Sequence, residues 1–187
     1  RAAGAELNVA IGLARLGLKS GWVSRLGNDS FGRFIQATLD NEHVDRRAVS
    51  VDAAYPTGFQ LKSKTENGTD PIVEYFRKGS AASRLSVADF DCAYFTRARH
   101  LHLTGVAAGL SSESWELCAH AARWMREQGK TISFDPNIRP VLWRSEEEMV
   151  TKLNQLACMA DWVMPGLKEG TQLTGCTHPE AIDSSKT

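Results

Sequence analysis

Hydrophobic and polar residues follow one another along this chain with a spacing that changes twice. In the first part, apolar residues recur every three or four positions, which is typical of helices with one buried face. The pattern predicts a helix over residues 5–16 that ends at Gly17, a short strand over 20–26, and a second helix capped by the turn at 27–30. The apolar face of the second helix carries Phe31, Phe34, Ile35 and Leu39.

Between residues 57 and 77 the spacing becomes that of β-strands. Two extended segments, 57–65 and 71–77, are joined by Glu66-Asn67-Gly68-Thr69, and Asn-Gly is a strong hairpin signal. Alternation places Val73, Tyr75 and Arg77 on one face of the second strand, and Ile72, Glu74 and Phe76 on the other. Because both faces mix apolar and polar groups, we expect this hairpin to stand away from the main sheet as part of a lid.

From residue 97 onward, predicted strands alternate with predicted helices. The strands cover 100–104, 131–134 and 162–164, and the helices cover 112–128, 145–159 and 167–173. Ser145 and Glu148 have the spacing of a capping box at the start of one of these helices. Alternation of this kind is typical of right-handed βαβ units, so the sequence predicts an α/β fold with a parallel sheet.

Composition limits the kinds of partner. The chain has 187 residues, of which 42% are hydrophobic, and its 22 basic and 22 acidic residues give a formal net charge of zero. Such a chain has no overall attraction for nucleic acid or for an anionic membrane, and no apolar run approaches the roughly 20 residues of a membrane span. We therefore expect neither partner, and any recognition of anions must come from local groups.

Cysteine and histidine spacing gives no sign of a metal centre. The four cysteines form no zinc-type pair, so we interpret them as reduced thiols of a cytoplasmic protein. His100 and His102 alternate on one predicted strand, which favours a structural role. The sequence predicts no direct metal ligand and no Ser-His-Asp constellation.

Candidate chemistry follows two of the predicted strands, where ligands bind in open parallel sheets. The loop 134–140 contains two prolines and presents Asn137 and Arg139, and arginine is suited to bidentate contact with carboxylate or phosphate. A surface loop with a solvated arginine is the alternative. The loop 165–169 contains Glu169. A functional acid and an acidic residue at an ordinary helix start are equally good interpretations of this position.

Two further segments offer polar groups to a ligand. Tyr75 and Arg77 supply a hydroxyl and a cation on one face of the hairpin, although a solvated sheet face would look the same. Gly4 and Asn8 put a small residue and an amide at a helix N-terminus, where polar ligands are attracted.

Taken together, these segments resemble the ribokinase/phosphofructokinase-B family of sugar kinases. The resemblance rests on three runs at the start of the chain: Gly4-Ala5-Glu6-Leu7-Asn8-Val9-Ala10, Leu13-Ala14-Arg15-Leu16-Gly17 and Leu26-Gly27-Asn28-Asp29-Ser30-Phe31-Gly32. Three later runs are similar to the branch that acts on 2-keto-3-deoxygluconate, with 2-ketogluconate kinases close by: Pro56-Thr57-Gly58-Phe59, Tyr75-Phe76-Arg77-Lys78-Gly79-Ser80-Ala81-Ala82-Ser83 and Asp135-Pro136-Asn137-Ile138-Arg139.

The resemblance implies a three-layer α/β/α domain over residues 1–187, with 57–77 in a β-sheet lid through which family members dimerise. It implies that the sugar is contacted by Gly4, Asn8, Gln60, Tyr75, Phe76, Arg77 and Arg139, and that Asn137, Arg139 and Glu169 serve ATP, magnesium and phosphate. Two positions depart from the family. Gln60 stands where some members have a substrate-contacting tyrosine, and Gly166 replaces the asparagine of an Asn-x-x-Glu motif.

The activity implied is ATP- and Mg²⁺-dependent phosphorylation of a 2-keto sugar acid, with 2-keto-3-deoxygluconate converted to its 6-phosphate. A 2-ketogluconate kinase is the alternative, as is a non-catalytic sugar-acid-binding module if the chain ends at Thr187. The family's first strand and its C-terminal ATP-binding and catalytic region have no match here. We therefore expect the catalytic base outside this chain, and a protein of this length alone to be inactive.

Overall fold

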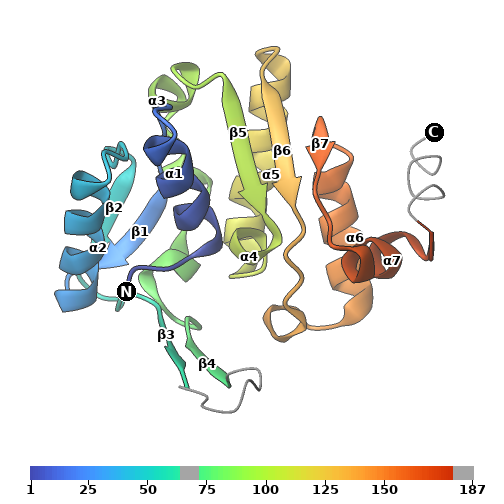
Figure 1. Ribbon diagram of the computed structural model, residues 1–187, viewed down its shortest axis with the longest axis horizontal. Coiled ribbons are helices and arrows are strands. Elements are labelled where there is room, and N and C mark those ends of the chain that lie inside the picture. Colours follow the sequence, from blue (N-terminus) through green and yellow to red (C-terminus); the bar gives the residue numbers. More distant parts are fainter. Residues whose placement is uncertain (64–71, 179–187) are drawn as a thin grey trace. The chain divides into compact units, whose positions relative to one another are not determined.

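The computed structural model describes residues 1–63 and 72–178 (Figure 1). The turn expected at 66–69 lies outside these residues. The chain divides into two compact units, Arg1–Leu85 and Ser86–Thr187, and each is described by itself.

The first unit has two helices beside a pair of parallel strands. Helix α1 covers Ala5–Arg15, β1 covers Ser24–Gly27, α2 covers Ser30–Asn41 and β2 covers Val49–Asp52. Strands β1 and β2 pair in parallel. The core of this unit comprises the buried residues Leu7, Ala10, Leu39 and Val44, with Ala2, Ile11, Ala14, Trp22, Ile35 and Val49 packed against them.

Two sequence predictions about this unit need correction. The strand expected over 20–26 begins only at Ser24, because Trp22 packs its side chain into the helix core and Gly21 makes an isolated bridge to Asp45. Phe31 and Phe34, expected on the apolar face of α2, are 54% and 49% exposed.

The predicted hairpin pairs as expected in its described part. Strand β3, Phe59–Lys62, runs antiparallel to β4, Val73–Phe76, and these two strands form a sheet separate from β1 and β2. We call them the β3–β4 ribbon. The short helix η1, Ala81–Arg84, follows it and ends the unit.

The second unit is a three-stranded parallel sheet with helices between the strands. Its strands are β5 (His100–Thr104), β6 (Thr131–Asp135) and β7 (Trp162–Val163), in the order β5-β6-β7. The helices are η2 (Val87–Asp89), α3 (Cys92–Thr96), α4 (Gly105–Ala108), α5 (Ser112–Glu127), η3 (Pro140–Leu142), α6 (Glu146–Ala157) and α7 (Leu167–Thr174).

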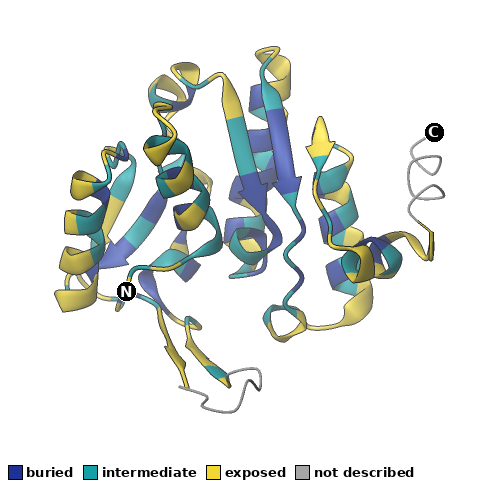
Figure 2. Cartoon of the chain, in the orientation of Figure 1, coloured by how far each residue is buried: buried dark blue, intermediate teal, exposed yellow. Residues whose placement is uncertain are grey.

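The core of this unit lies between one face of the sheet and helices α5 and α6. Ile132 and Phe134 alternate along β6 and are almost fully buried, and α5 contributes Met125 while α6 contributes Leu153. Figure 2 shows this burial along β6 and on one side of each helix. The βαβ order and the parallel pairing are those that the sequence predicts.

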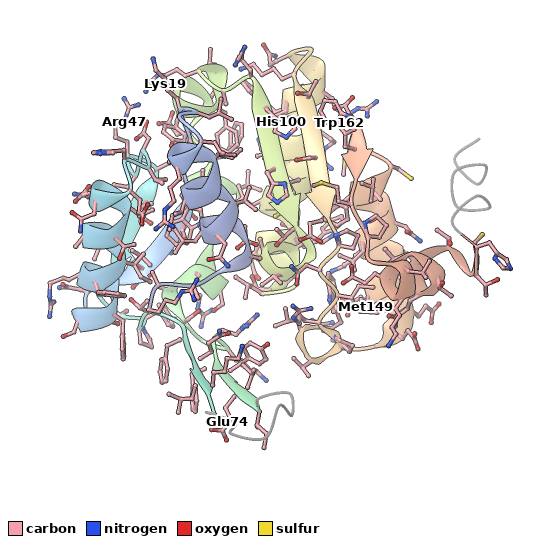
Figure 3. The ribbon with its side chains drawn as sticks, viewed as in Figure 1. Lys19, Arg47, Glu74, His100, Met149 and Trp162 are labelled. Atoms are coloured by element: carbon pink, nitrogen blue, oxygen red, sulfur yellow. The ribbon has the colours of Figure 1, made fainter. Side chains whose placement is uncertain are left out.

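The opposite face of this sheet is polar. His100 bonds through its two ring nitrogens to Thr131 Oγ1 (2.9 Å) and Ser133 Oγ (2.7 Å), and His102 Nδ1 also contacts Ser133 Oγ (2.9 Å). The His100 ring also lies 5.7 Å from the Trp162 ring (Figure 3). Burial lowers the pKa of His100, against the opposing charge of Asp161. These contacts support the structural role expected for both histidines.

The start of α6 forms half of the predicted capping box. The Ser145 hydroxyl accepts a hydrogen bond from the Glu148 N–H at 3.1 Å, but the Glu148 carboxylate accepts one from Arg144 N at 3.2 Å. Within the described ranges no helix is long and apolar enough to cross a membrane.

Candidate functional site

The root of the β3–β4 ribbon is held by the N-terminus of α2. Asp29 caps this helix by accepting a hydrogen bond from Gly32 N (2.7 Å), and its second oxygen accepts one from Thr57 N (2.7 Å). Thr57 is buried, and its hydroxyl accepts the N–H of Gly27 at 2.9 Å. Burial of the Asp29 carboxyl opposes ionisation, but the N–H donors outweigh it and lower the pKa of Asp29.

One face of the ribbon presents three of the residues expected at the site. Gln60 lies directly opposite Tyr75 in the strand register. The Arg77 guanidinium carbon lies 4.0 Å from the centre of the Tyr75 ring, a cation–π contact. Tyr75 is 39% exposed. This face therefore offers a cation, a hydroxyl and an amide to a ligand.

Phe76 lies on the other face. It pairs with Phe59 across the strands, and the two rings stack with centroids 4.6 Å apart. Successive strand residues point to opposite sides. The expectation that Phe76 contacts a ligand together with Tyr75 and Arg77 therefore does not fit this geometry.

Gly4 and Asn8 occupy the first turn of α1. Gly4 is the N-cap residue, and its carbonyl accepts a hydrogen bond from Asn8 N at 2.9 Å. The exposed Asn8 lines a cavity of about 380 Å³ between α1 and α2, where Arg15 and Glu42 form an ion pair. Asn8 is thus accessible, as a ligand contact requires.

In the second unit, the loop after β6 is fixed by its own aspartate. Asp135 accepts hydrogen bonds from Asn137 N (3.0 Å) and from Asn137 Nδ2 (3.1 Å). Asn137 has a positive φ of 37°, which non-glycine residues adopt rarely. Its side-chain oxygen Oδ1 is buried and has no hydrogen-bond partner within the described part of the chain.

Glu169 ties this loop to the start of α7. Its Oε1 accepts a hydrogen bond from Ile138 N at 2.7 Å, and its Oε2 accepts one from Gly166 N at 2.9 Å. Both carboxylate oxygens are therefore engaged with backbone N–H groups. Among residues 1–63 and 72–178, no group of three or more His, Cys, Asp or Glu side chains could hold a metal ion. This geometry fits a residue that positions the loop.

Arg139 is the cation of this loop. Its Nη1 donates to the carbonyl of Ile138 at 2.7 Å, and its side chain is half-buried. Across the described ranges it has no ion pair with a carboxylate. A partly buried guanidinium without an acidic partner is suited to bind an anionic ligand.

The loop after β5 was not among the sites predicted from the sequence. Thr104 caps α4 through its hydroxyl, which accepts from Val106 N at 3.2 Å. A side chain on Gly105 would place its Cβ 1.9 Å from the carbonyl oxygen of Pro136, so only glycine lets the two loops meet. The rule that singled out the loop after β6 applies equally to this one, since Thr104 also ends a strand.

Comparisons with known proteins identify the family of this chain. A family model described as pfkB family carbohydrate kinase matches residues 1–186. The chain is 51% identical to the 2-dehydro-3-deoxygluconokinase of Bacillus subtilis (strain 168), over 96% of this chain and 56% of that protein. It is 35% identical to the fructokinase of Escherichia coli, over 94% of this chain and 56% of that protein. The chain thus spans a little over half the length of these relatives.

Solved structures extend the likeness to the fold. A PfkB protein from Polaromonas sp. JS666 aligns with a TM-score of 0.94 and 53% identity, over 97% of this chain and 61% of that one. The 2-dehydro-3-deoxygluconokinase of Thermotoga maritima aligns with a TM-score of 0.88 and 26% identity, over 95% of this chain and 54% of that one. A putative ribokinase II from E. coli in complex with ATP and Mg²⁺ aligns with a TM-score of 0.88 and 27% identity, over 98% of this chain and 58% of that one. The predicted ribokinase-like α/β fold is confirmed, and the chain belongs to the pfkB family of carbohydrate kinases.

Proposed function

We propose that this chain forms the sugar-binding part of an ATP-dependent kinase whose substrate is 2-keto-3-deoxygluconate, phosphorylated at its primary hydroxyl. The kinase class follows from the family. The similarity to the B. subtilis enzyme named for this sugar acid supports the substrate. The observation that carries the choice of an anionic sugar is the Arg77 guanidinium, held over the Tyr75 ring on an exposed face of the ribbon.

A sugar acid needs a charge-assisted donor because its carboxylate must leave water. The chain has no net charge, so no overall field draws the anion in. Arg77 supplies the local charge, the Tyr75 hydroxyl and Gln60 amide supply hydrogen bonds to sugar oxygens, and Asn8 with the Gly4 backbone supplies a second polar surface. We assign the sugar to these five residues.

We assign the loop after β6 to the phosphoryl group that is transferred. Arg139 offers a guanidinium without an acidic partner in the described ranges, and a guanidinium is a charge-assisted donor suited to a phosphoryl group. In-line transfer breaks the bond between the γ-phosphorus and the oxygen that leaves with ADP, and it forms a bond to the sugar oxygen, whose proton passes to the catalytic base expected outside this chain. Negative charge shifts between oxygens, so a fixed cation at this point stabilises the transition state.

A neighbour solved with ATP and Mg²⁺ supports both as requirements of the reaction. No group of three or more His, Cys, Asp or Glu side chains among the described residues could hold a metal ion. Both Glu169 oxygens accept backbone N–H groups. We therefore give Glu169 the task of positioning Ile138 and its neighbours, and we derive no step from direct metal ligation by this chain.

The outer face of the ribbon suits contact with a second copy of the protein, as we expect for a lid through which homo-oligomers form. Phe59, Leu61, Ile72 and Phe76 are all exposed large hydrophobic residues. Burying such a surface between two copies is favourable. Leu61→Asp should shift the measured mass of the protein in solution toward the monomer, and an unchanged mass would argue against this interface.

The test of the proposed substrate is a comparison of kcat/KM values for the intact protein with ATP and Mg²⁺. The sugars are 2-keto-3-deoxygluconate, 2-ketogluconate and fructose. We expect both acids to be used far better than fructose, since fructose has no carboxylate for Arg77. A higher kcat/KM for fructose would reject the proposal.

Gln60 favours 2-ketogluconate as the second candidate substrate. Gln60 faces the same side as Tyr75, and a glutamine amide can bond to the additional hydroxyl of this acid. If Gln60 has this role, kcat/KM for 2-ketogluconate should equal or exceed that for the 3-deoxy acid. A strong preference for the 3-deoxy acid would remove the role.

A further inference from the structure

The β3–β4 ribbon contacts the start of α2 at two points, and these points are two residues apart in both parts of the chain. Asp29 bonds to Thr57 N at 2.7 Å, and two residues further along each segment Phe31 stacks on Phe59. The Phe31 and Phe59 ring centroids are 5.3 Å apart, with planes inclined by 20°. The first turn of α2 therefore holds the root of the ribbon and its first strand residue together.

The stack continues across the ribbon. Phe59 and Phe76 are cross-strand partners, with rings nearly parallel at 6° and centroids 4.6 Å apart. Phe31, Phe59 and Phe76 form a continuous row of three rings from a helix to both strands, which we call the aromatic ladder. Stacked aromatic pairs add stability beyond the area they bury, so the ladder favours one orientation of the ribbon relative to α2.

The ladder lies on the side of the ribbon that faces away from the proposed ligand groups. Phe76 stands between Tyr75 and Arg77 in the sequence, and alternation sends its ring to the opposite face. The Arg77 guanidinium rests on the Tyr75 ring, so a tilt of the ribbon would move both side chains together. By opposing such a tilt, the ladder keeps both in place.

Within one copy of the chain, and beyond the root where Ala81 N donates to the Pro56 carbonyl at 2.8 Å, the described residues make few other contacts that could fix this orientation. All four residues of β3 are exposed, and Glu74, Tyr75 and Phe76 of β4 are exposed as well. The hydrogen bonds of the strands run from one strand to the other, which stabilises the ribbon but does not orient it. A ribbon without the ladder would have to be ordered when the ligand binds, and that ordering weakens binding.

We propose that Phe31 is a positioning residue for the sugar acid: through the aromatic ladder it holds the Tyr75–Arg77 face ready for the ligand, although its own ring lies on the other side of the ribbon. This inference rests on the proposed function for its ligand. The ladder itself can be tested without any ligand.

The ligand-free test is hydrogen exchange of backbone amides in β3 and β4. Phe31→Ala should raise exchange rates there several-fold and leave those of β1 and β2 unchanged, because local opening depends on local contacts. Phe34→Ala is the matched control, since Phe34 is on the same helix with similar exposure and takes no part in the ladder. Unchanged ribbon rates in Phe31→Ala, or equal changes in the control, would overturn the proposal.

The kinetic test separates positioning from general damage. In the intact protein, Phe31→Ala should raise KM for the sugar acid roughly threefold to tenfold, with kcat and KM for ATP unchanged. Phe31→Trp keeps a ring in the ladder and should restore most of the affinity. A fall in kcat with an unchanged KM for the sugar acid would contradict the proposal.

A double substitution tests whether Phe31 acts through Arg77. In an Arg77→Met background, Phe31→Ala should raise KM for the sugar acid by a smaller factor than in the original protein, because the cation of the face that it positions is gone and only Tyr75 and Gln60 remain. Fully additive effects would show that Phe31 acts elsewhere. If the intact protein phosphorylates no sugar acid at all, the proposed function fails, while the exchange measurements still decide whether the ladder orients the ribbon.

Discussion

Glu169 and Ile138 are 31 residues apart in the sequence, and the Glu169 carboxylate accepts the Ile138 N–H at 2.7 Å while its other oxygen accepts Gly166 N. A glutamine at 169 can accept only one of these bonds. Glu169→Gln should therefore cost about 1–3 kcal/mol of unfolding free energy and lower kcat, as measured by urea denaturation and steady-state kinetics.

Metal titration distinguishes the two roles of Glu169. If it positions the loop, the Mg²⁺ concentration that gives half-maximal activity should be the same in Glu169→Gln as in the original protein. A large rise in that concentration would identify Glu169 as a metal ligand. Glu147→Gln, on the exposed surface of α6, is the control.

Gly105 should tolerate no side chain. The Cβ of an alanine would lie 1.9 Å from the Pro136 carbonyl oxygen, a backbone atom that can move only with the whole loop. We expect Gly105→Ala to lower the unfolding free energy by about 1–3 kcal/mol. Gly12→Ala, in α1 with no atom within 4 Å of the new Cβ, should instead stabilise the protein by about 0.5–1 kcal/mol. Equal effects in thermal unfolding would refute the close approach.

Asp29 should make stability depend on acid pH. Its pKa is lowered in the folded protein, so its contribution is fully present above the ordinary carboxyl pKa of about 3.9 and is lost as pH falls through the folded-state value. Asp29→Asn can accept only one of the two N–H bonds, and should be less stable than the original by about 0.5–2 kcal/mol at pH 7. Urea denaturation at several pH values should show this difference shrinking below about pH 4. A difference independent of pH would contradict the account.

Arg139 should act on the chemical step. Removal of a charge-assisted hydrogen bond costs about 1.5–3 kcal/mol, which corresponds to a loss of roughly tenfold to hundredfold. Because its contact with the phosphoryl group should strengthen as charge shifts, Arg139→Ala should lower kcat as well as kcat/KM. Arg123→Ala, an exposed arginine of α5, should leave both unchanged. Wild-type kinetics in Arg139→Ala would remove it from the site.

Much of the fold follows from local signals in the sequence. Gly17 and Gly129, with φ of 81° and 66°, stop α1 and α5 where the pattern predicts. The face shared by Tyr75 and Arg77 follows from strand alternation alone. The start of β1 could not be predicted in this way, because Trp22 favours a strand locally but packs against the helices.

Contacts between residues far apart in the sequence could not be predicted from local patterns. The Asp29–Thr57 bond and the close approach of Gly105 to Pro136 exist only after the chain has folded. From the sequence, Glu169 could be interpreted only as an acidic residue in the first turn of a helix. No neighbouring residue indicates its hydrogen bond with Ile138 N. Helical spacing predicts Phe31 on the apolar face of α2. That spacing cannot show that the Phe31 ring stacks on Phe59 of strand β3.

The central claim is that Arg77 binds the carboxylate of a 2-keto sugar acid, and the KM values of Arg77→Met test it most directly. Methionine keeps an unbranched side chain of similar length without the charge. In the intact protein, KM for 2-keto-3-deoxygluconate should rise roughly tenfold to hundredfold, while KM for ATP stays within about twofold. An unchanged KM for the sugar acid, or an equal rise in KM for ATP, would contradict the account.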